Sequence, residues 1–81
     1  MLLPEDLAHK LFQFASTHYN SSALLCSPAE MGIACEQIAA EWCVAQGSEV
    51  SPSSDEMQFI TALAARFGKC LGDFYHSERE G

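Results

Sequence analysis

Cysteine and histidine are the side chains of this sequence best suited to chemistry. The 81 residues include four cysteines and three histidines: Cys26, Cys35, Cys43, Cys70, His9, His18 and His76. Structural zinc sites take their ligands in close pairs, such as C-x2-C, because a single turn then delivers two of them. The cysteines here are nine, eight and twenty-seven residues apart. The spacing therefore predicts no metal site and no cofactor, with thiols that pack as small apolar side chains.

Carboxylates are the second group that could do chemistry. Glu36, Glu41 and Asp73 could form acid-base pairs, but on amphipathic helices they are typical of solvated charges. No nucleophile motif and no glycine-rich phosphate loop occurs. A chain this short also has little room for a ligand cavity of about 300 Å³ or more. We therefore expect the protein not to be an enzyme.

The charge balance argues against nucleic acid as a partner. Eleven acidic residues face only four basic ones, giving a net charge of −7 that repels a phosphate backbone. A helix-turn-helix reader would need several bases on its recognition helix, and the sequence offers too few. An acidic surface that imitates DNA remains an alternative, although the sequence has no dense row of carboxylates.

Hydrophobic content predicts a folded protein without a membrane span. Apolar residues make up 48% of the chain, too many for a disordered segment. No apolar run approaches the roughly 20 residues that cross a bilayer. The opening residues 1–3 are followed directly by Pro4-Glu5-Asp6, which is unlike a signal peptide. We therefore expect a cytoplasmic protein with reduced cysteines.

The elements that would position these side chains are helices. Ser27 and Glu30 have the spacing of a capping box, in which each side chain bonds the other's backbone N–H, and Ser53 and Glu56 repeat it. Residues 22–26 form either a packed connection or a single extra turn. The predicted organisation is one domain over 1–81, with helices at about 4–19, 28–46 and 54–76, a linker at 47–53 and a frayed tail at 77–81.

The predicted fold is therefore a small all-α bundle of three helices, or four if residues 22–26 form a turn. A domain of this size buries only about 60% of the surface that its unfolded chain exposes, so its stability is marginal. Without disulfides or a metal, we expect a second copy of the chain to complete the bundle.

The helix predicted over 28–46 carries more apolar surface than one neighbour can cover. One apolar stripe contains Met31, Ala34, Cys35, Ile38, Trp42 and Ala45. A second stripe of Ile33, Ala40 and Val44 lies nearly opposite when residues are placed 100° apart. Such a helix needs two neighbours, which are either the other two helices of the chain or another protein.

Small residues mark a second candidate contact, on the helix predicted over 54–76. Ala65, Gly68 and Gly72 share one flank, and two glycines within a helix suggest that another backbone approaches closely. The predicted interface comprises Ile33, Ala40, Trp42, Val44, Ala65, Gly68 and Gly72.

These features favour a protein-binding module, a regulator or adaptor that sequesters or occludes another protein. A thiol- or metal-responsive sensor and the DNA mimic remain the alternatives.

Overall fold

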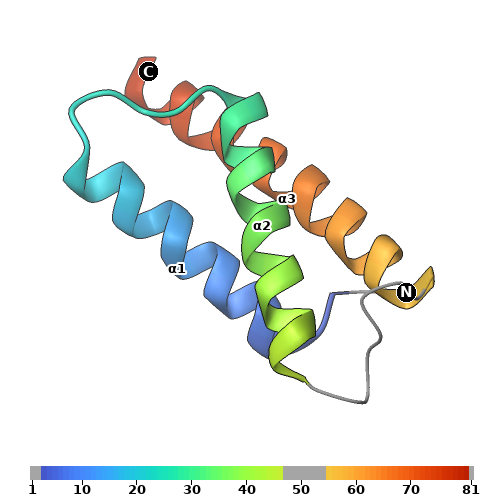
Figure 1. Cartoon of the computed structure of the whole chain (residues 1–81). Coiled ribbons are helices and arrows are strands. Elements are labelled where there is room, and N and C mark those ends of the chain that lie inside the picture. The colour runs from blue at the N-terminus through green and yellow to red at the C-terminus, as the bar shows by residue number, and fades with distance from the viewer. Residues whose placement is uncertain (1–2, 47–54, 81) are drawn as a thin grey trace.

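The described part of the chain forms three helices, as the sequence predicts. The computed structural model describes residues 3–46 and 55–80, with α1 at Glu5–Ser21, α2 at Pro28–Ala45 and α3 at Asp55–Glu80. Helices α1 and α3 run in the same direction, and α2 runs back between them (Figure 1). The 26 residues of α3 measure about 39 Å at 1.5 Å per residue, nearly the full 43 Å length of the molecule. The all-α prediction is confirmed, and no strand occurs within 3–46 or 55–80.

The start of α2 follows the sequence signal closely. The Ser27 hydroxyl accepts a hydrogen bond from the Glu30 backbone N–H at 3.2 Å, and the Glu30 carboxylate accepts one from the Ser27 N–H at 3.0 Å. Both partners lie within one turn, so the local sequence alone determines this cap.

The predicted linker 47–53 and its Ser53 cap lie outside the described residues.

Residues 22–26 form a connection without a helical turn, which is one of the two predicted alternatives. The predicted frayed tail is wrong for residues 77–80, which form the last turn of α3. The guanidinium of Arg79 explains why this turn is ordered. Arg79 donates hydrogen bonds to the backbone carbonyls of Tyr19, Ser22 and Ala23, and it lies over the Tyr19 ring at 5.1 Å. These carbonyls belong to the end of α1 and the turn after it, where helices leave acceptors unpaired. Arg79 thereby joins α3 to α1.

Helices α2 and α3 pack with their backbones close together. A Cβ added to Gly32 would lie 2.8 Å from the Ala65 carbonyl oxygen, and one added to Gly68 would lie 2.6 Å from the Met31 carbonyl oxygen. Atoms do not approach this closely, so both positions accept only glycine at this helix separation. The sequence correctly indicated that a backbone approaches Gly68, and the structure identifies that backbone as α2.

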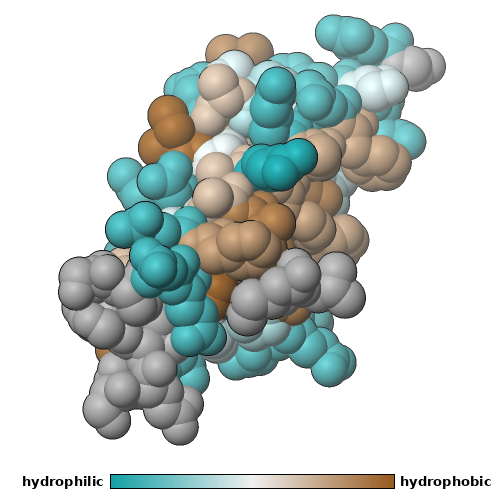
Figure 2. Space-filling model, turned by 90° about the vertical axis from the view of Figure 1, so that its right-hand side faces the viewer, coloured by the Kyte–Doolittle hydropathy of each residue, from teal (hydrophilic) through white to brown (hydrophobic). Residues whose placement is uncertain are grey.

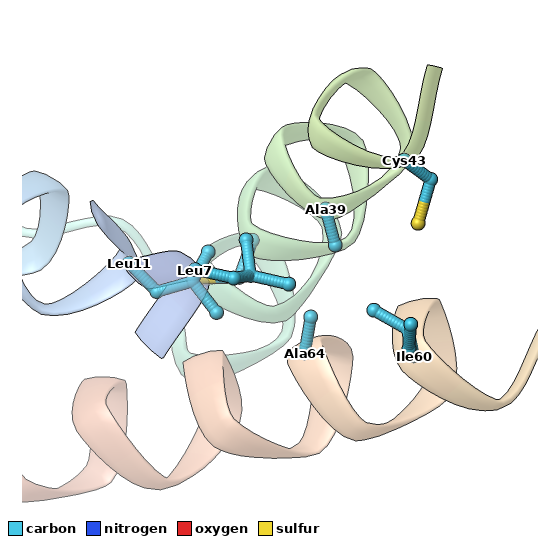
Figure 3. Close-up of a cluster of buried hydrophobic side chains, with 7 residues drawn as sticks. Leu7, Leu11, Ala39, Cys43, Ile60 and Ala64 are labelled. Atoms are coloured by element: carbon cyan, nitrogen blue, oxygen red, sulfur yellow. The ribbon is translucent and has the colours of Figure 1, made fainter. Parts of the chain in front are cut away.

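The core is built from small side chains and a few large ones. All three helices contribute to its main cluster: Leu7, Leu11, Cys35, Ala39, Cys43, Ile60 and Ala64 (Figure 3). A smaller cluster of Ala15, Met31 and Tyr75 lies beside it. Alanine, cysteine and glycine dominate the α2–α3 contact because larger side chains would force the helices apart.

Replacing Gly68 with alanine tests the close approach. The new methyl group would meet both the Met31 carbonyl and the Cys35 sulfur, at 2.6 and 2.7 Å. Overpacking of this kind costs about 1–3 kcal/mol, and the helix propensity of alanine returns about 1 kcal/mol of it. We expect Gly68→Ala to lower the free energy of unfolding in urea, whereas Ser77→Ala on the exposed side of α3 should not. A variant as stable as the wild type would contradict this packing.

Candidate protein-binding surfaces

The outer side of α2 is apolar and open. Ile33 is 58% exposed and Val44 is 61% exposed, with half-buried Ala40 between them on the same side of the helix. The opposite side of α2 is buried against α1 and α3 through Met31, Cys35, Ala39 and Cys43. We call Ile33, Ala40 and Val44 the α2 ridge. The chain's own helices cover the first apolar stripe of α2 and leave the second uncovered.

Glutamates border the α2 ridge on both sides. At 100° per residue, Glu30 and Glu41 fall on one flank and Glu36 on the other, and all three are exposed. No lysine or arginine occurs in α2. The α2 ridge is therefore an apolar strip bordered by negative charge.

The small residues of α3 lie on a different side of the molecule. Gly68 and Gly72 are buried, and a Cβ on Gly72 would lie 2.7 Å from the Pro28 Cα of α2. Ala65 is half-buried, and its carbonyl oxygen is the close neighbour of Gly32. These three residues contact α2 of the same chain and do not join the α2 ridge.

Trp42 lies between α1 and α2. Its indole N–H donates a hydrogen bond to the Asp6 carboxylate at 3.1 Å, and its ring is half-buried against the main core cluster. An open groove beside it is also lined by Lys10, Phe14 and Ile38. Trp42 thus fastens α1 to α2 while keeping one edge accessible.

A second apolar surface was missed by the sequence reasoning. Phe59 and Phe74 on α3 are 45% and 56% exposed, and Phe12 on α1 is 52% exposed. Helical spacing places Leu63 and Cys70 on the same side of α3 as these two phenylalanines. We call Phe12, Phe59, Leu63, Cys70 and Phe74 the phenylalanine face.

The space-filling view shows one face of the molecule, where apolar side chains gather between hydrophilic ones (Figure 2). Apolar periodicity along a sequence does not say how wide a stripe a neighbouring helix covers, so the exposure of Phe74 and Phe12 does not follow from it. The available signal was the breadth of the apolar set on α3, where Phe59 and Ala64 lie about 140° apart.

Two histidines hold the connection between α1 and α2. The Cys26 N–H donates to His18 Nε2 at 3.0 Å, and the Cys26 carbonyl accepts from His76 Nε2 at 2.7 Å. His18 Nε2 accepts this hydrogen bond, and His18 Nδ1 lies 3.1 Å from the Ser22 hydroxyl oxygen. His76 is half-buried in its contact with Cys26. Both rings have a structural role here.

The four cysteines are free and differ in accessibility. Cys35 and Cys43 are fully buried, Cys26 is half-buried and Cys70 is exposed. Burial raises the pKa of the Cys35 thiol, and burial together with the nearby Glu56 charge raises the pKa of Cys43. A raised pKa keeps a thiol protonated and unreactive. Within residues 3–46 and 55–80, no three histidine, cysteine or acidic side chains are grouped so that they could hold a metal ion.

Comparisons with known proteins add no assignment. The chain matches no protein-family model, no curated protein and no solved structure. Among the described helices, none is both long and apolar enough to cross a membrane. The surfaces themselves are therefore the basis for a functional proposal.

Thiol reactivity provides a test of the burial pattern. With a disulfide reagent at pH 8, at a dilution where the chain is monomeric, we expect Cys70 to react first and Cys26 more slowly. Cys35 and Cys43 should react only as fast as the protein unfolds, because their thiols are inaccessible and protonated. Cys70→Ser should remove the fast phase alone. Four thiols that react together in the native protein would be inconsistent with this core.

The capping box predicts a specific dependence on pH. Its hydrogen bonds with Ser27 lower the pKa of the Glu30 carboxyl from 4.5. A carboxyl whose pKa is lowered by folding stabilises the fold above its unfolded pKa, and this stabilisation disappears as pH falls through the folded pKa. We expect the wild type to be more stable than Glu30→Gln at pH 6, and the difference to shrink by pH 3. Equal differences at both pH values in urea titrations would exclude an ionised cap.

Proposed function

We propose that this protein is a protein-binding module that acts as a regulator or adaptor by occluding or sequestering another protein through the α2 ridge. One observation supports this most directly. A helix that is apolar around its circumference is normally buried, yet Ile33 and Val44 of α2 are mostly exposed. Exposed apolar side chains in a row along one helix are typical of helix-in-groove recognition.

The charges around the ridge indicate the chemistry of the partner. Glu30, Glu36 and Glu41 would repel an acidic surface and attract lysine and arginine side chains. The partner that we propose therefore presents an apolar groove or helix with a basic rim. Such charges mainly raise the rate of association, while Ile33 and Val44 supply the buried contact area.

A catalytic or sensory role has less support from the structure. Cys70 is the one cysteine of α3, so a thiol-responsive switch would need a second cysteine from another element, and Cys35 and Cys43 are fully buried. A DNA mimic needs closely spaced carboxylates, and the glutamates of α2 are separated by the apolar ridge.

Two further parts of the proposal concern assembly and location. We propose that the protein is a homodimer, because a small domain with a second exposed apolar surface gains stability by covering it. We also propose that it acts in the cytoplasm, where its four free cysteines would stay reduced.

Charge substitutions on the α2 ridge test the proposed function. Ile33→Asp with Val44→Asp should abolish binding of a protein that the wild type captures from native cell extract, because a carboxylate cannot enter an apolar contact without losing its hydration. After the captured protein is purified, we expect titration calorimetry to show a loss of roughly 100-fold or more in affinity and unchanged helicity by circular dichroism.

The matched control is His9→Asp with Gln13→Asp, which adds the same charge to exposed positions of α1. This control should bind as the wild type does, and binding by the wild type should weaken as salt increases. If the ridge variant binds the purified partner as tightly as the control, the α2 ridge is not the binding site.

A further inference from the structure

We propose that the phenylalanine face binds the same face of a second copy of the chain, with the two α3 helices antiparallel about an axis between Arg66 and Phe67. This inference rests on the homodimer in the proposed function, and it does not depend on the α2 ridge. The inference specifies which surface of the chain forms the dimer and in which register the two α3 helices lie.

The spacing of the apolar residues on α3 is symmetric along the helix. Phe59, Leu63, Cys70 and Phe74 are separated by four, seven and four residues, so their midpoint lies between positions 66 and 67. In an antiparallel two-fold pair, each residue meets the one equally far on the other side of the midpoint. Phe59 would then meet Phe74 of the second copy, and Leu63 would meet Cys70. By the two-fold symmetry each of these contacts occurs twice, and each places a phenylalanine or leucine against an apolar side chain.

Charge distinguishes this face from the α2 ridge as a site for a second copy. Two α2 ridges would bring three glutamates of each copy together without a single base between them. Between Phe59 and Phe74, the charged residues that border the apolar positions of α3 are Arg66 and Asp73, which lie along the same edge and have opposite signs. A second copy therefore meets far less repulsion on α3 than on α2.

The acidic ends of α3 lie beyond the apolar contacts of the pair. Asp55 of one copy would lie level with Glu78 of the other, about 17 Å along the helix from the midpoint, whereas Phe59 and Phe74 lie only about 11 Å from it. At a crossing angle of about 20° the two helices diverge by roughly 4 Å at the phenylalanines and roughly 6 Å at the acidic ends. The apolar contacts therefore form, and the like charges of the ends lie outside them.

The exposed area suits a modest dimer. About half of each side chain of Phe12, Phe59 and Phe74 is exposed, which amounts to roughly 300 Å² at about 200 Å² per phenylalanine. A stable interface buries about 800 Å² per partner, so these three residues supply more than a third of it. Phe12 contributes from α1, whose neighbouring Tyr19 stacks on Tyr75 of α3 at 4.6 Å.

Sedimentation of the full chain tests which face pairs. We expect the wild type to be a dimer and Phe74→Glu to raise its dissociation constant by roughly tenfold or more, with helicity unchanged. Ile33→Asp with Val44→Asp should leave the dimer intact, which separates this inference from the proposed function. A wild type that is monomeric at every concentration would overturn the proposal. A dimer that dissociates only in the α2 ridge variant would also overturn the proposal. A phenylalanine face that binds only a different protein would do the same.

Spin labels test the register without disturbing the apolar contacts. In a background of Cys26→Ser and Cys70→Ala, labels on Arg66→Cys should be separated by less than roughly 20 Å, since both lie near the axis. Labels on Ser77→Cys should be roughly 30 Å apart, because each lies ten or eleven residues from the midpoint at 1.5 Å per residue. Short distances at both positions would show parallel helices and overturn the antiparallel register.

Arg66 provides a matched charge test. The two copies of Arg66 would lie side by side near the axis, so Arg66→Gln should tighten the dimer several-fold at low salt by removing a like-charge pair. Lys69→Gln removes the same charge from a position one turn away, on the side of α3 toward α2, and should have no effect. Equal effects of both substitutions would contradict the proposed axis.

Discussion

The close approach of α2 and α3 is the constraint on which the rest of this structure depends. Gly32 and Gly68 let the two backbones come almost into contact, and the surrounding alanines and cysteines keep the space between them narrow. The contact gains stability from many dispersion interactions at close range. It leaves no room for bulky side chains, however, and these are displaced to the edges of the helix pair. The exposed aromatic and branched residues are thus a consequence of how tightly the centre is packed.

The two exposed surfaces that result differ in electrostatic character. The α2 ridge lies among carboxylates, whereas the phenylalanine face is bordered by Arg66 and Asp73, which have opposite signs. A border of one sign favours association with a different protein of opposite charge, and a symmetric face with a balanced border favours association with itself. One small domain can therefore carry a surface for assembly and a separate surface for recognition without competition between them.

Local signals in the sequence determine the helices, whereas the exposed surfaces depend on tertiary packing. The Ser27 cap and the surplus apolar stripe of α2 could be predicted because each follows from residues within a few turns of one another. The close approach at Gly68 could also be predicted, but its partner helix could not. The exposure of Phe74 depends on where α1 lies on α3, and the order of the last turn depends on Arg79 reaching an element about sixty residues earlier. No local pattern contains that information.

The contact between Arg79 and the end of α1 also bears on the order of folding during synthesis. Helices α1 and α2 emerge from the ribosome first, but the guanidinium that bonds the carbonyls of Tyr19, Ser22 and Ala23 arrives only with the last turn of α3. Until the last turns of α3 emerge, the end of α1 lacks both these bonds and the Tyr19–Tyr75 stack, and the sides of α1 and α2 that α3 covers remain open to solvent. The nascent chain therefore passes through a stage with more exposed hydrophobic surface than the finished protein, when a chaperone or a neighbouring chain would find it most accessible.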